Sequence, residues 1–246
     1  MASKGLSYST VKCYLAGISF NLKLNNFTDP CQFFIVQKML LGLKRTKNVK
    51  DVRSPITLPL LNQLLNALPH VCHNYYEYIL FAAAYCLAFF ALLRVGEITL
   101  TNAQTSYDPL RLENIVLEPS HLIINILRSK TDQAGKGTRL QVNRNSDNQP
   151  LFSCLHAYIK IRPQCAGQFL CHIDSTPLTY SQFQKVLKKA LAFIKIDTST
   201  FKSHSFRIGA ATQLFLNGAT EAEIKSKGRW RSNSYKTYIR PESIIM

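Results

Sequence analysis

The chain has 246 residues, of which 46% are hydrophobic and 18% are charged. This composition excludes a disordered chain and allows one folded domain plus part of another. Lysine and arginine number 30 against 14 acidic residues, which gives a formal net charge of +16. Because this excess is spread over the whole chain, it favours a polyanionic partner, most often nucleic acid. A basic protein without a special ligand is the alternative.

The chain contains seven cysteines, an odd number, without a C-x-x-C pair or a zinc-type Cys/His spacing. They indicate a reducing compartment. The longest apolar run, residues 79–93, is too short to span a bilayer, and no secretory leader opens the chain. We therefore expect a location in the cytoplasm or the nucleus and no membrane partner. Since the chain has no acidic cluster or Cys/His quartet, we expect no metal and no cofactor.

The first fifty residues predict two helices followed by a linker. Apolar residues recur with helical spacing over residues 7–24, and a serine at the start of that stretch can cap the helix. Pro30 suits the first turn of a second helix, which we expect to end near Leu43. Residues 44–55 are polar and basic and have no apolar periodicity, so they predict a linker.

Residues 51–246 predict a mostly helical domain with one small antiparallel sheet, so the expected fold class is α+β, mainly α. A β-branched stretch at residues 114–142, which carries a turn-rich tip, predicts the strands. Gly218 is well placed to end one of the helices in the C-terminal part. The expected helices cover residues 58–68, 75–93, 151–161, 179–195, 205–217, 220–227 and 233–240.

Arg94 ends the long apolar run, and Glu97 follows it three positions later. A guanidinium that emerges from a buried helix needs a partner. One interpretation is a structural ion pair between the two residues. The other is a preorganised fork for a phosphate group, oriented by the carboxylate of Glu97.

Two further stretches place phosphate-compatible side chains at the edges of predicted elements. Lys130 lies at the hairpin tip, where most lysines are only solvated. If the tip folds over a substrate, however, Lys130 can protonate a leaving oxygen. His204 and Arg207 are three positions apart and project from one face at a helix start, which also favours an anion. Alone, this H-x-x-R pattern is weak evidence, because chance explains most instances.

Residues 228–240 combine the only tryptophan of the chain, Trp230, with Tyr235, Tyr238 and four basic residues. The indole N–H of Trp230 can donate a hydrogen bond, although a core aromatic is the plain alternative. A tyrosine in a cationic site can act as a nucleophile, and ordinary packing is the alternative for both tyrosines. Their spacing of one helical turn does not choose between them.

The order of these motifs resembles the tyrosine recombinase (phage integrase) family from residue 55 to the end. The wordings "HSFRIGAAT" and "GRW…YIRP" are similar to those of Cre-like recombinases, and most of all to Crypton/DIRS-type recombinases of eukaryotic mobile elements. The N-terminal stretch resembles the last helices of the family's core-binding domain. The resemblance implies part of a helical core-binding (SAM-like) domain at residues 1–50 and a tyrosine recombinase catalytic domain at residues 51–246.

By position, the resemblance assigns the phosphate-binding roles. Arg94 and Arg207 would hold the non-bridging oxygens of the scissile phosphate. His204 and Trp230 would add hydrogen bonds there, and His204 would also assist proton transfer. Glu97 would support the side of the site formed by Arg94 and His204.

The resemblance also assigns the groups that make and break bonds. Tyr238 would be the nucleophile, because the family's tyrosine typically precedes a pair similar to Ile239-Arg240, and Tyr235 is its rival. Lys130 would be the general acid for the leaving 5′-oxygen. Fixed cations would stabilise the phenolate and the pentacoordinate phosphate, so neither a metal ion nor ATP would be required.

The implied function is that of a site-specific DNA recombinase or integrase, which cleaves and rejoins double-stranded DNA through a covalent 3′-phosphotyrosine. The resemblance further implies a homo-oligomer on DNA, a synaptic tetramer. Only eight residues follow Tyr238, so the family's C-terminal helix, which enters a neighbouring protomer, is expected to be absent or rudimentary. The alternatives are a mobile-element-derived DNA-binding protein without strand exchange and a type IB topoisomerase-like enzyme.

Overall fold

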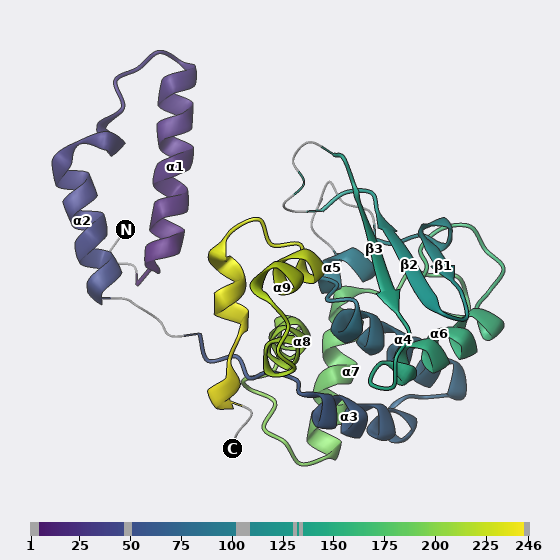
Figure 1. Ribbon diagram of the computed structural model, residues 1–246. Helices are drawn as coiled ribbons and strands as arrows, with labels where there is room; N and C mark the ends of the chain where they lie inside the picture. The colour runs from purple at the N-terminus through teal and green to yellow at the C-terminus, as the bar shows by residue number, and fades with distance from the viewer. Residues whose placement is uncertain (1–4, 47–50, 102–108, 130–131, 133–134, 244–246) are drawn as a thin grey trace. The chain divides into compact units, whose positions relative to one another are not determined.

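The computed structural model describes residues 5–46, 51–101, 109–129, 132 and 135–243. The chain divides into two compact units, Met1–Val52 and Arg53–Met246 (Figure 1). Within the described ranges, no helix combines the length and the apolar character that crossing a membrane requires.

The smaller unit consists of two helices, α1 (Tyr8–Leu24) and α2 (Phe34–Thr46), with the 3₁₀ turn η2 (Pro30–Gln32) between them. The prediction that Pro30 opens the second helix is wrong, because Pro30 opens η2 instead. Asp29 caps this turn by accepting the backbone N–H of Cys31, and the chain is extended again at Phe33 before α2 begins. The second helix also continues past the predicted end at Leu43 to Thr46.

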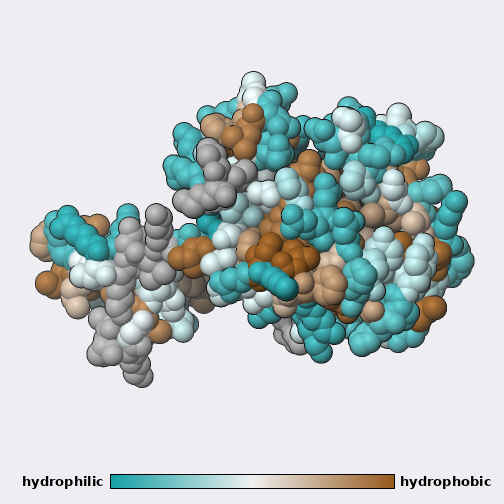
Figure 2. All heavy atoms as spheres, turned by 90° about the horizontal axis from the view of Figure 1, so that it is seen from below, coloured by the Kyte–Doolittle hydropathy of each residue, from teal (hydrophilic) through white to brown (hydrophobic). Residues whose placement is uncertain are grey.

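The smaller unit has almost no core of its own. Its only described residues that are buried are Val11, Ser19 and Cys31, each still 6–8% exposed, and α2 buries none. Brown, hydrophobic residues lie open at its surface in Figure 2. The exposed large apolar side chains are Tyr14, Ile18, Phe20, Leu24, Phe27, Phe33, Phe34, Ile35, Met39 and Leu41. Two helices of this size bury too little apolar surface to be stable alone.

The larger unit is built around α4 (Tyr75–Phe90), whose residues are buried almost throughout. A helix that is apolar on all sides belongs in the centre of a domain. Helices pack against it from several sides (Figure 1). They are α3 (Leu58–Val71), α6 (Gln149–Ile161), α7 (Tyr180–Phe193) and α8 (His204–Leu216).

The central helix ends earlier than predicted. The expected end was near residue 93, but α4 stops at Phe90, and Leu92 adopts a left-handed conformation with φ of 47°. A left-handed residue cannot continue a right-handed helix, and this conformation is unfavourable for any residue with a β-carbon. The short helix α5 (Val95–Ile98) then begins, and Arg94 is its N-cap residue. Arg94 therefore opens a new helix and does not emerge from the end of the buried one.

The predicted small antiparallel sheet is confirmed. Its strands are β1 (Ile115–Leu117), β2 (His121–Ile126) and β3 (Thr138–Asn143), in the order β1-β2-β3. Leu122, Ile124 and Ile126 of β2 are buried and alternate with half-buried residues, as expected for a sheet that covers a core on one face. Between β2 and β3, the carboxylate of Asp132 accepts the backbone N–H of Gly137 at 2.7 Å.

The C-terminal elements are α8, α9 (Glu221–Gly228), η4 (Asn233–Tyr238) and η5 (Pro241–Ser243). Gly218 follows α8 with φ of 77°, which confirms the predicted helix end. The helix predicted over residues 233–240 is present as the 3₁₀ helix η4, which is two residues shorter than expected. It ends at Tyr238, since Ile239 is extended and Pro241 follows. The fold class is α+β, mainly α, as predicted.

Candidate active site

Arg94 and Glu97 form a compact pair at the start of α5. The Glu97 carboxylate accepts the backbone N–H of Arg94 at 2.8 Å and Nη1 of the Arg94 guanidinium at 3.0 Å. The Arg94 side chain is 19% exposed, whereas that of Glu97 is 7% exposed. The ion pair expected from the sequence is therefore present, and the Arg94 guanidinium retains further N–H donors at a partly open position.

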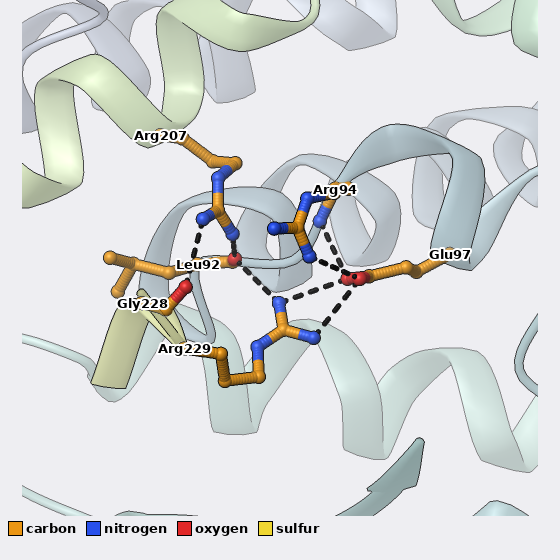
Figure 3. A network of polar contacts seen from close by, with 6 residues as sticks. All are labelled: Leu92, Arg94, Glu97, Arg207, Gly228 and Arg229. Atoms are coloured by element: carbon orange, nitrogen blue, oxygen red, sulfur yellow. Dashed lines mark hydrogen bonds and ion pairs between the residues drawn. The ribbon is translucent and has the colours of Figure 1, made fainter. Parts of the chain in front are cut away.

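A second guanidinium, which the sequence analysis did not assign, binds the same carboxylate. Nη1 and Nη2 of Arg229 lie 3.0 and 2.9 Å from the two oxygens of Glu97, and Nη2 also donates to the carbonyl of Leu92 at 3.0 Å (Figure 3). Arg229 is the C-cap residue of α9 and has a left-handed φ of 57°. In the sequence, Arg229 is marked only by its place beside Trp230 in a basic stretch. Residue spacing does not reveal the left-handed conformation that turns its side chain toward Glu97.

Glu97 remains ionised in this setting. Burial alone would raise its pKa, but the ion pairs with Arg229 and then Arg94 outweigh that effect and lower the pKa of the Glu97 carboxyl below its usual value. One carboxylate thus faces two guanidinium groups.

Arg207 brings a third guanidinium to the same place. It lies in the first turn of α8, is 1% exposed, and donates through Nη2 to the carbonyl of Gly228 at 2.9 Å and through Nη1 to that of Leu92 (Figure 3). Burial, with the positive charges of Arg94 and Arg229, lowers the pKa of Arg207 to about 9. The group is therefore still charged at neutral pH.

The three guanidinium groups are not neutralised by the residues around them. Within the described part of the chain, Arg207 has no carboxylate partner, and Glu97 is shared between Arg94 and Arg229. The Nε atoms of Arg207 and Arg229 are buried without a hydrogen-bond partner. Buried N–H groups normally have an acceptor. This cluster therefore has an excess of positive charge and free donors, which suits a bound anion.

Aromatic rings lie directly against the cluster. The Cζ atom of Arg207 is 4.8 Å from the centroid of the Trp230 ring and 5.7 Å from that of the Tyr238 ring. The Trp230 and Tyr238 centroids are 5.0 Å apart, and the rings of His204 and Tyr238 stack at 6.3 Å with an interplanar angle of 22°. The structure thus brings His204, Arg207, Trp230 and Tyr238 together.

The two candidate tyrosines have different surroundings. Tyr235 is 4% exposed, and Lys225 Nζ lies 5.2 Å from its ring centroid. Burial and a hydrogen bond with Glu221 raise the pKa of Tyr235. Tyr238 is half-buried and touches the arginine cluster, whereas no described contact joins Tyr235 to that cluster.

The backbone around Tyr238 is held by α8 of the same chain. The Thr212 hydroxyl lies 2.7 Å from the carbonyl oxygen of Ile208 and 3.1 Å from that of Tyr238. Its single proton is within reach of both acceptors. It accepts the backbone N–H of Arg240 at 3.0 Å. The Arg240 guanidinium in turn donates to the carbonyl of Arg53. Tyr238 is thus anchored from both sides.

A cavity of about 290 Å³ joins the β2–β3 connection to the cluster. From the connection and β3 it is lined by Ser129, Asp132 and Thr138, and from the other side by Arg229, Trp230 and their neighbours. Lys130, the predicted general acid, lies outside the described residues. Among the residues that are described, no group of three or more His, Cys, Asp or Glu side chains could hold a metal ion.

The sequence matches no protein-family model and no curated protein. Solved structures, however, are similar over nearly the whole chain. The Tn1549 transposon integrase in complex with circular-intermediate DNA matches with a TM-score of 0.65 and 16% identity, over 98% of this chain and 78% of that one. The XerH site-specific recombinase bound to its difH substrate matches with a TM-score of 0.57 and 12% identity, over 96% and 67%. The XerA recombinase matches with 0.57 and 15%, over 98% and 81%.

These similar structures are all tyrosine recombinases or integrases, and two of the three are complexes with DNA. The larger unit, a helical domain with a small three-stranded antiparallel sheet, has the fold of the tyrosine recombinase catalytic domain. At 12–16% identity, the likeness establishes the fold alone.

Proposed function

We propose that the protein is a site-specific DNA recombinase or integrase, which cleaves and rejoins double-stranded DNA through a covalent 3′-phosphotyrosine. The observation that carries this proposal is the cluster of Arg94, Arg207 and Arg229 around the single carboxylate of Glu97, with the Tyr238 ring against it. A phosphodiester supplies the anion that this cluster lacks. The net charge of +16 and the DNA complexes among the similar structures support DNA as the partner.

In the proposed reaction, Tyr238 gives up its phenol proton with the help of His204, its oxygen attacks the scissile phosphorus, and the bond from phosphorus to the 5′-oxygen breaks. Arg94 and Arg207 bind the non-bridging oxygens, and His204 and Trp230 donate further hydrogen bonds. Three of these roles are supported by ring contacts. His204 and Trp230 lie against the Tyr238 ring, and Arg207 lies against the Trp230 ring. Attack by a 5′-hydroxyl on the phosphotyrosine then reverses the step and reseals the strand.

Proton transfer and charge stabilisation complete the proposal. Lys130 protonates the leaving 5′-oxygen, and the cavity lined by its neighbour Ser129 together with Arg229 and Trp230 supports a role close to the cluster. The guanidinium groups supply the positive charge that metal ions supply in other phosphoryl-transfer enzymes. The phosphotyrosine keeps the energy of the broken bond, so we propose a reaction without metal and without ATP.

The wider setting is proposed from the sequence resemblance. Residues 1–50 would be part of the core-binding domain, and the open apolar side chains of α1 and α2 support a role in a larger assembly. The enzyme would act as a homo-oligomer on DNA, in a synaptic tetramer. The affiliation that we propose is Crypton/DIRS-type, from a mobile element, with activity in the nucleus or the cytoplasm.

The decisive test is to trap the covalent intermediate. The full chain is incubated with a randomised library of nicked double-stranded oligonucleotides. After cleavage beside the nick, the short end fragment diffuses away, so the strand cannot be resealed. Protein–DNA adducts that resist denaturation are then digested and analysed by mass spectrometry. We expect DNA attached to Tyr238, with adduct lost in Tyr238→Phe and kept in the matched Tyr235→Phe variant. Adduct on Tyr235 would overturn the assignment of the nucleophile. Salt-dependent DNA binding without any adduct would favour the DNA-binding protein that lacks strand exchange.

A further inference from the structure

A second buried arginine without an acidic partner lies in the larger unit, apart from the residues of the proposed reaction. Arg162 follows α6 directly, is 4% exposed, and forms no ion pair with a carboxylate among the described residues. Its Nε atom is buried without a hydrogen-bond partner. Its Nη2 atom lies 3.5 and 3.4 Å from the carbonyls of Cys165 and Gln168. These contacts are near the upper limit for a hydrogen bond.

Two thiol groups lie at the same nitrogen atom. The Sγ atoms of Cys165 and Cys171 are each 3.8 Å from Nη2 of Arg162. A buried cation whose acceptors are carbonyls, thiols and the Tyr158 hydroxyl, all of them uncharged, is costly unless an anion is formed beside it. A thiolate at one of these two cysteines is the anion that the site can supply, and a neighbouring cation is what makes a thiol ionise.

The two cysteines differ in access and in rigidity. Cys165 is half-buried between the exposed residues Gln164 and Ala166, whereas Cys171 is 1% exposed. The backbone of Cys171 is fixed, since its N–H donates to the Tyr158 hydroxyl at 2.9 Å and its carbonyl accepts from the Tyr76 hydroxyl at 2.7 Å. Cys165 is therefore the thiol that a small reagent can reach, and Cys171 is a fixed thiol behind it.

Hydrogen bonding supports ionisation at the accessible cysteine. A hydrogen bond from Ser175 lowers the pKa of the Cys165 thiol, burial opposes this effect, and the Cys171 thiol and the Arg162 charge add to the lowering. Both thiols are free, as are all the cysteines of the chain.

We propose that Arg162, Cys165 and Cys171 form a reactive-thiol site whose substrate is a hydroperoxide and whose product is a Cys165–Cys171 disulfide. The Cys165 thiolate attacks the terminal oxygen of hydrogen peroxide, the O–O bond breaks, and the released hydroxide takes a proton to become water. The Cys171 sulfur then attacks the Cys165 sulfenic acid, the S–O bond breaks, and a second water leaves. One peroxide is reduced, and two thiols are oxidised to the disulfide.

The geometry suits a disulfide within one loop. The residues are six positions apart in a segment without regular helix, and both sulfur atoms already lie against one nitrogen atom. Because Cys171 is held by two tyrosines, Cys165 is the residue that moves to reach the S–S distance of about 2.05 Å. This site does not depend on the proposed recombinase function.

The first test measures the reactivity of each thiol in the reduced, full-length protein. The native chain is treated with limiting iodoacetamide at neutral pH, and alkylation of each cysteine is followed over time by mass spectrometry. Cys13, which is exposed and has no arginine at its sulfur in the described structure, is the matched control. We expect Cys165 to react about fivefold faster than Cys13, because a thiolate is the reacting form. Equal rates at the two cysteines would overturn the proposal.

Variants then separate the effect of the cation from that of the fold. Arg162→Met is expected to lower the rate at Cys165, because it removes the positive charge beside the thiol. If this variant fails to fold, Ser175→Ala replaces it, because Ser175 is exposed and its loss removes only the hydrogen bond to the Cys165 thiol. An unchanged rate at Cys165 in the folded variant would contradict the proposed activation.

The second test follows the product. One equivalent of hydrogen peroxide is added, and peptides are mapped without reduction. We expect a Cys165–Cys171 cross-link in the wild type, and a trapped sulfenic acid at Cys165 in Cys171→Ser. The hydrogen-bonded pair of Cys86 and Cys154 is the internal control, since Cys86 is fully buried and the pair has no arginine among its described contacts. Oxidation of Cys86 and Cys154 ahead of Cys165 would refute the proposal.

Discussion

Arg229 and Glu97, which are 132 positions apart, are joined by two hydrogen bonds of 3.0 and 2.9 Å between a guanidinium and a carboxylate that are both buried. This pair fixes the end of α9 against the start of α5. It therefore holds Trp230 beside Arg207, because Trp230 follows Arg229 directly. A single carboxylate thus positions two arginines and the segment that leads to Tyr238.

The first prediction concerns the loss of this carboxylate. Glu97→Gln removes the charge that offsets Arg94 and Arg229, so we expect the free energy of unfolding to fall by about 3–5 kcal/mol. Urea unfolding measures this loss. Glu118→Gln is the matched control, because Glu118 is exposed, and its change should stay within about 0.5 kcal/mol. Similar losses in both variants would mean that the Glu97 network contributes nothing particular to stability.

The second prediction is the pH dependence of that contribution. The ion pairs hold the pKa of folded Glu97 below the value of 4.5 that applies to a free glutamate, despite the opposing effect of burial. The stabilisation is therefore complete above pH 4.5 and is lost as the pH falls through the lower pKa of the folded state. The difference in unfolding free energy between the wild type and Glu97→Gln should be constant near neutral pH and shrink in acid. A difference that grows in acid would contradict the assignment.

The third prediction uses the only tryptophan as a reporter of the site. A Cβ atom placed on Gly228 would lie 1.7 Å from a ring carbon of Trp230, so Gly228→Ala must displace the ring. Trp230 is 8% exposed, and we expect its fluorescence emission to shift to longer wavelength as the ring becomes hydrated. Gly42→Ala in α2 is the control, because nothing lies within 4 Å of its Cβ position. An unshifted emission in Gly228→Ala would argue against the packing of Trp230 described here.

The fourth prediction is that inorganic sulfate stabilises the protein through Arg207. This guanidinium is buried, and burial together with the charges of Arg94 and Arg229 lowers its pKa to about 9, so a bound anion should stabilise it. We expect sulfate at 100 times its dissociation constant to add about 2.7 kcal/mol of stability. Thermal unfolding at constant ionic strength measures the effect. It should disappear in Arg207→Gln and remain in Arg139→Gln, an exposed site on β3. An equal effect in all three proteins would indicate a general salt effect.

The sequence predicts elements and motif order better than it predicts backbone reversals. The β-branched stretch and Gly218 identified the sheet and a helix end, because both depend on local side-chain preferences. The end of α4 was not predicted, because the left-handed residue that follows the helix is Leu92, and leucine rarely adopts a left-handed conformation. As a result, the sequence did not show that the Leu92 carbonyl faces Arg207 and Arg229.

The same limit explains which site residues were missed. His204 and Arg207 share one helix turn, so their proximity could be predicted from spacing alone. The direction of the Arg229 side chain depends on a left-handed residue at a helix end and on a partner 132 positions away. Neither is encoded in a local pattern. The choice between Tyr235 and Tyr238 likewise rests on which ring reaches the cluster, and that follows from the tertiary packing of η4 on α8.

The last prediction concerns Thr212, which we propose as a positioning residue for Tyr238 and which touches no reacting atom. Its hydroxyl contacts the Tyr238 carbonyl at 3.1 Å and accepts the Arg240 N–H at 3.0 Å, while being fully buried. Thr212→Val keeps the shape but removes both contacts. We expect the rate of adduct formation to fall at least about tenfold while DNA affinity is unchanged, because these contacts hold Tyr238, the proposed nucleophile, and do not hold the DNA.

Thr212→Ser is the matched control for this prediction, because it restores the hydroxyl and loses only a methyl group. It should recover most of the rate of adduct formation in a single-turnover assay with the nicked substrate. The comparison separates positioning from stability, since the valine variant is expected to bury more apolar surface than the serine variant. A serine variant as slow as the valine variant would contradict the proposal, because it would show that the hydroxyl alone does not keep Tyr238 in place.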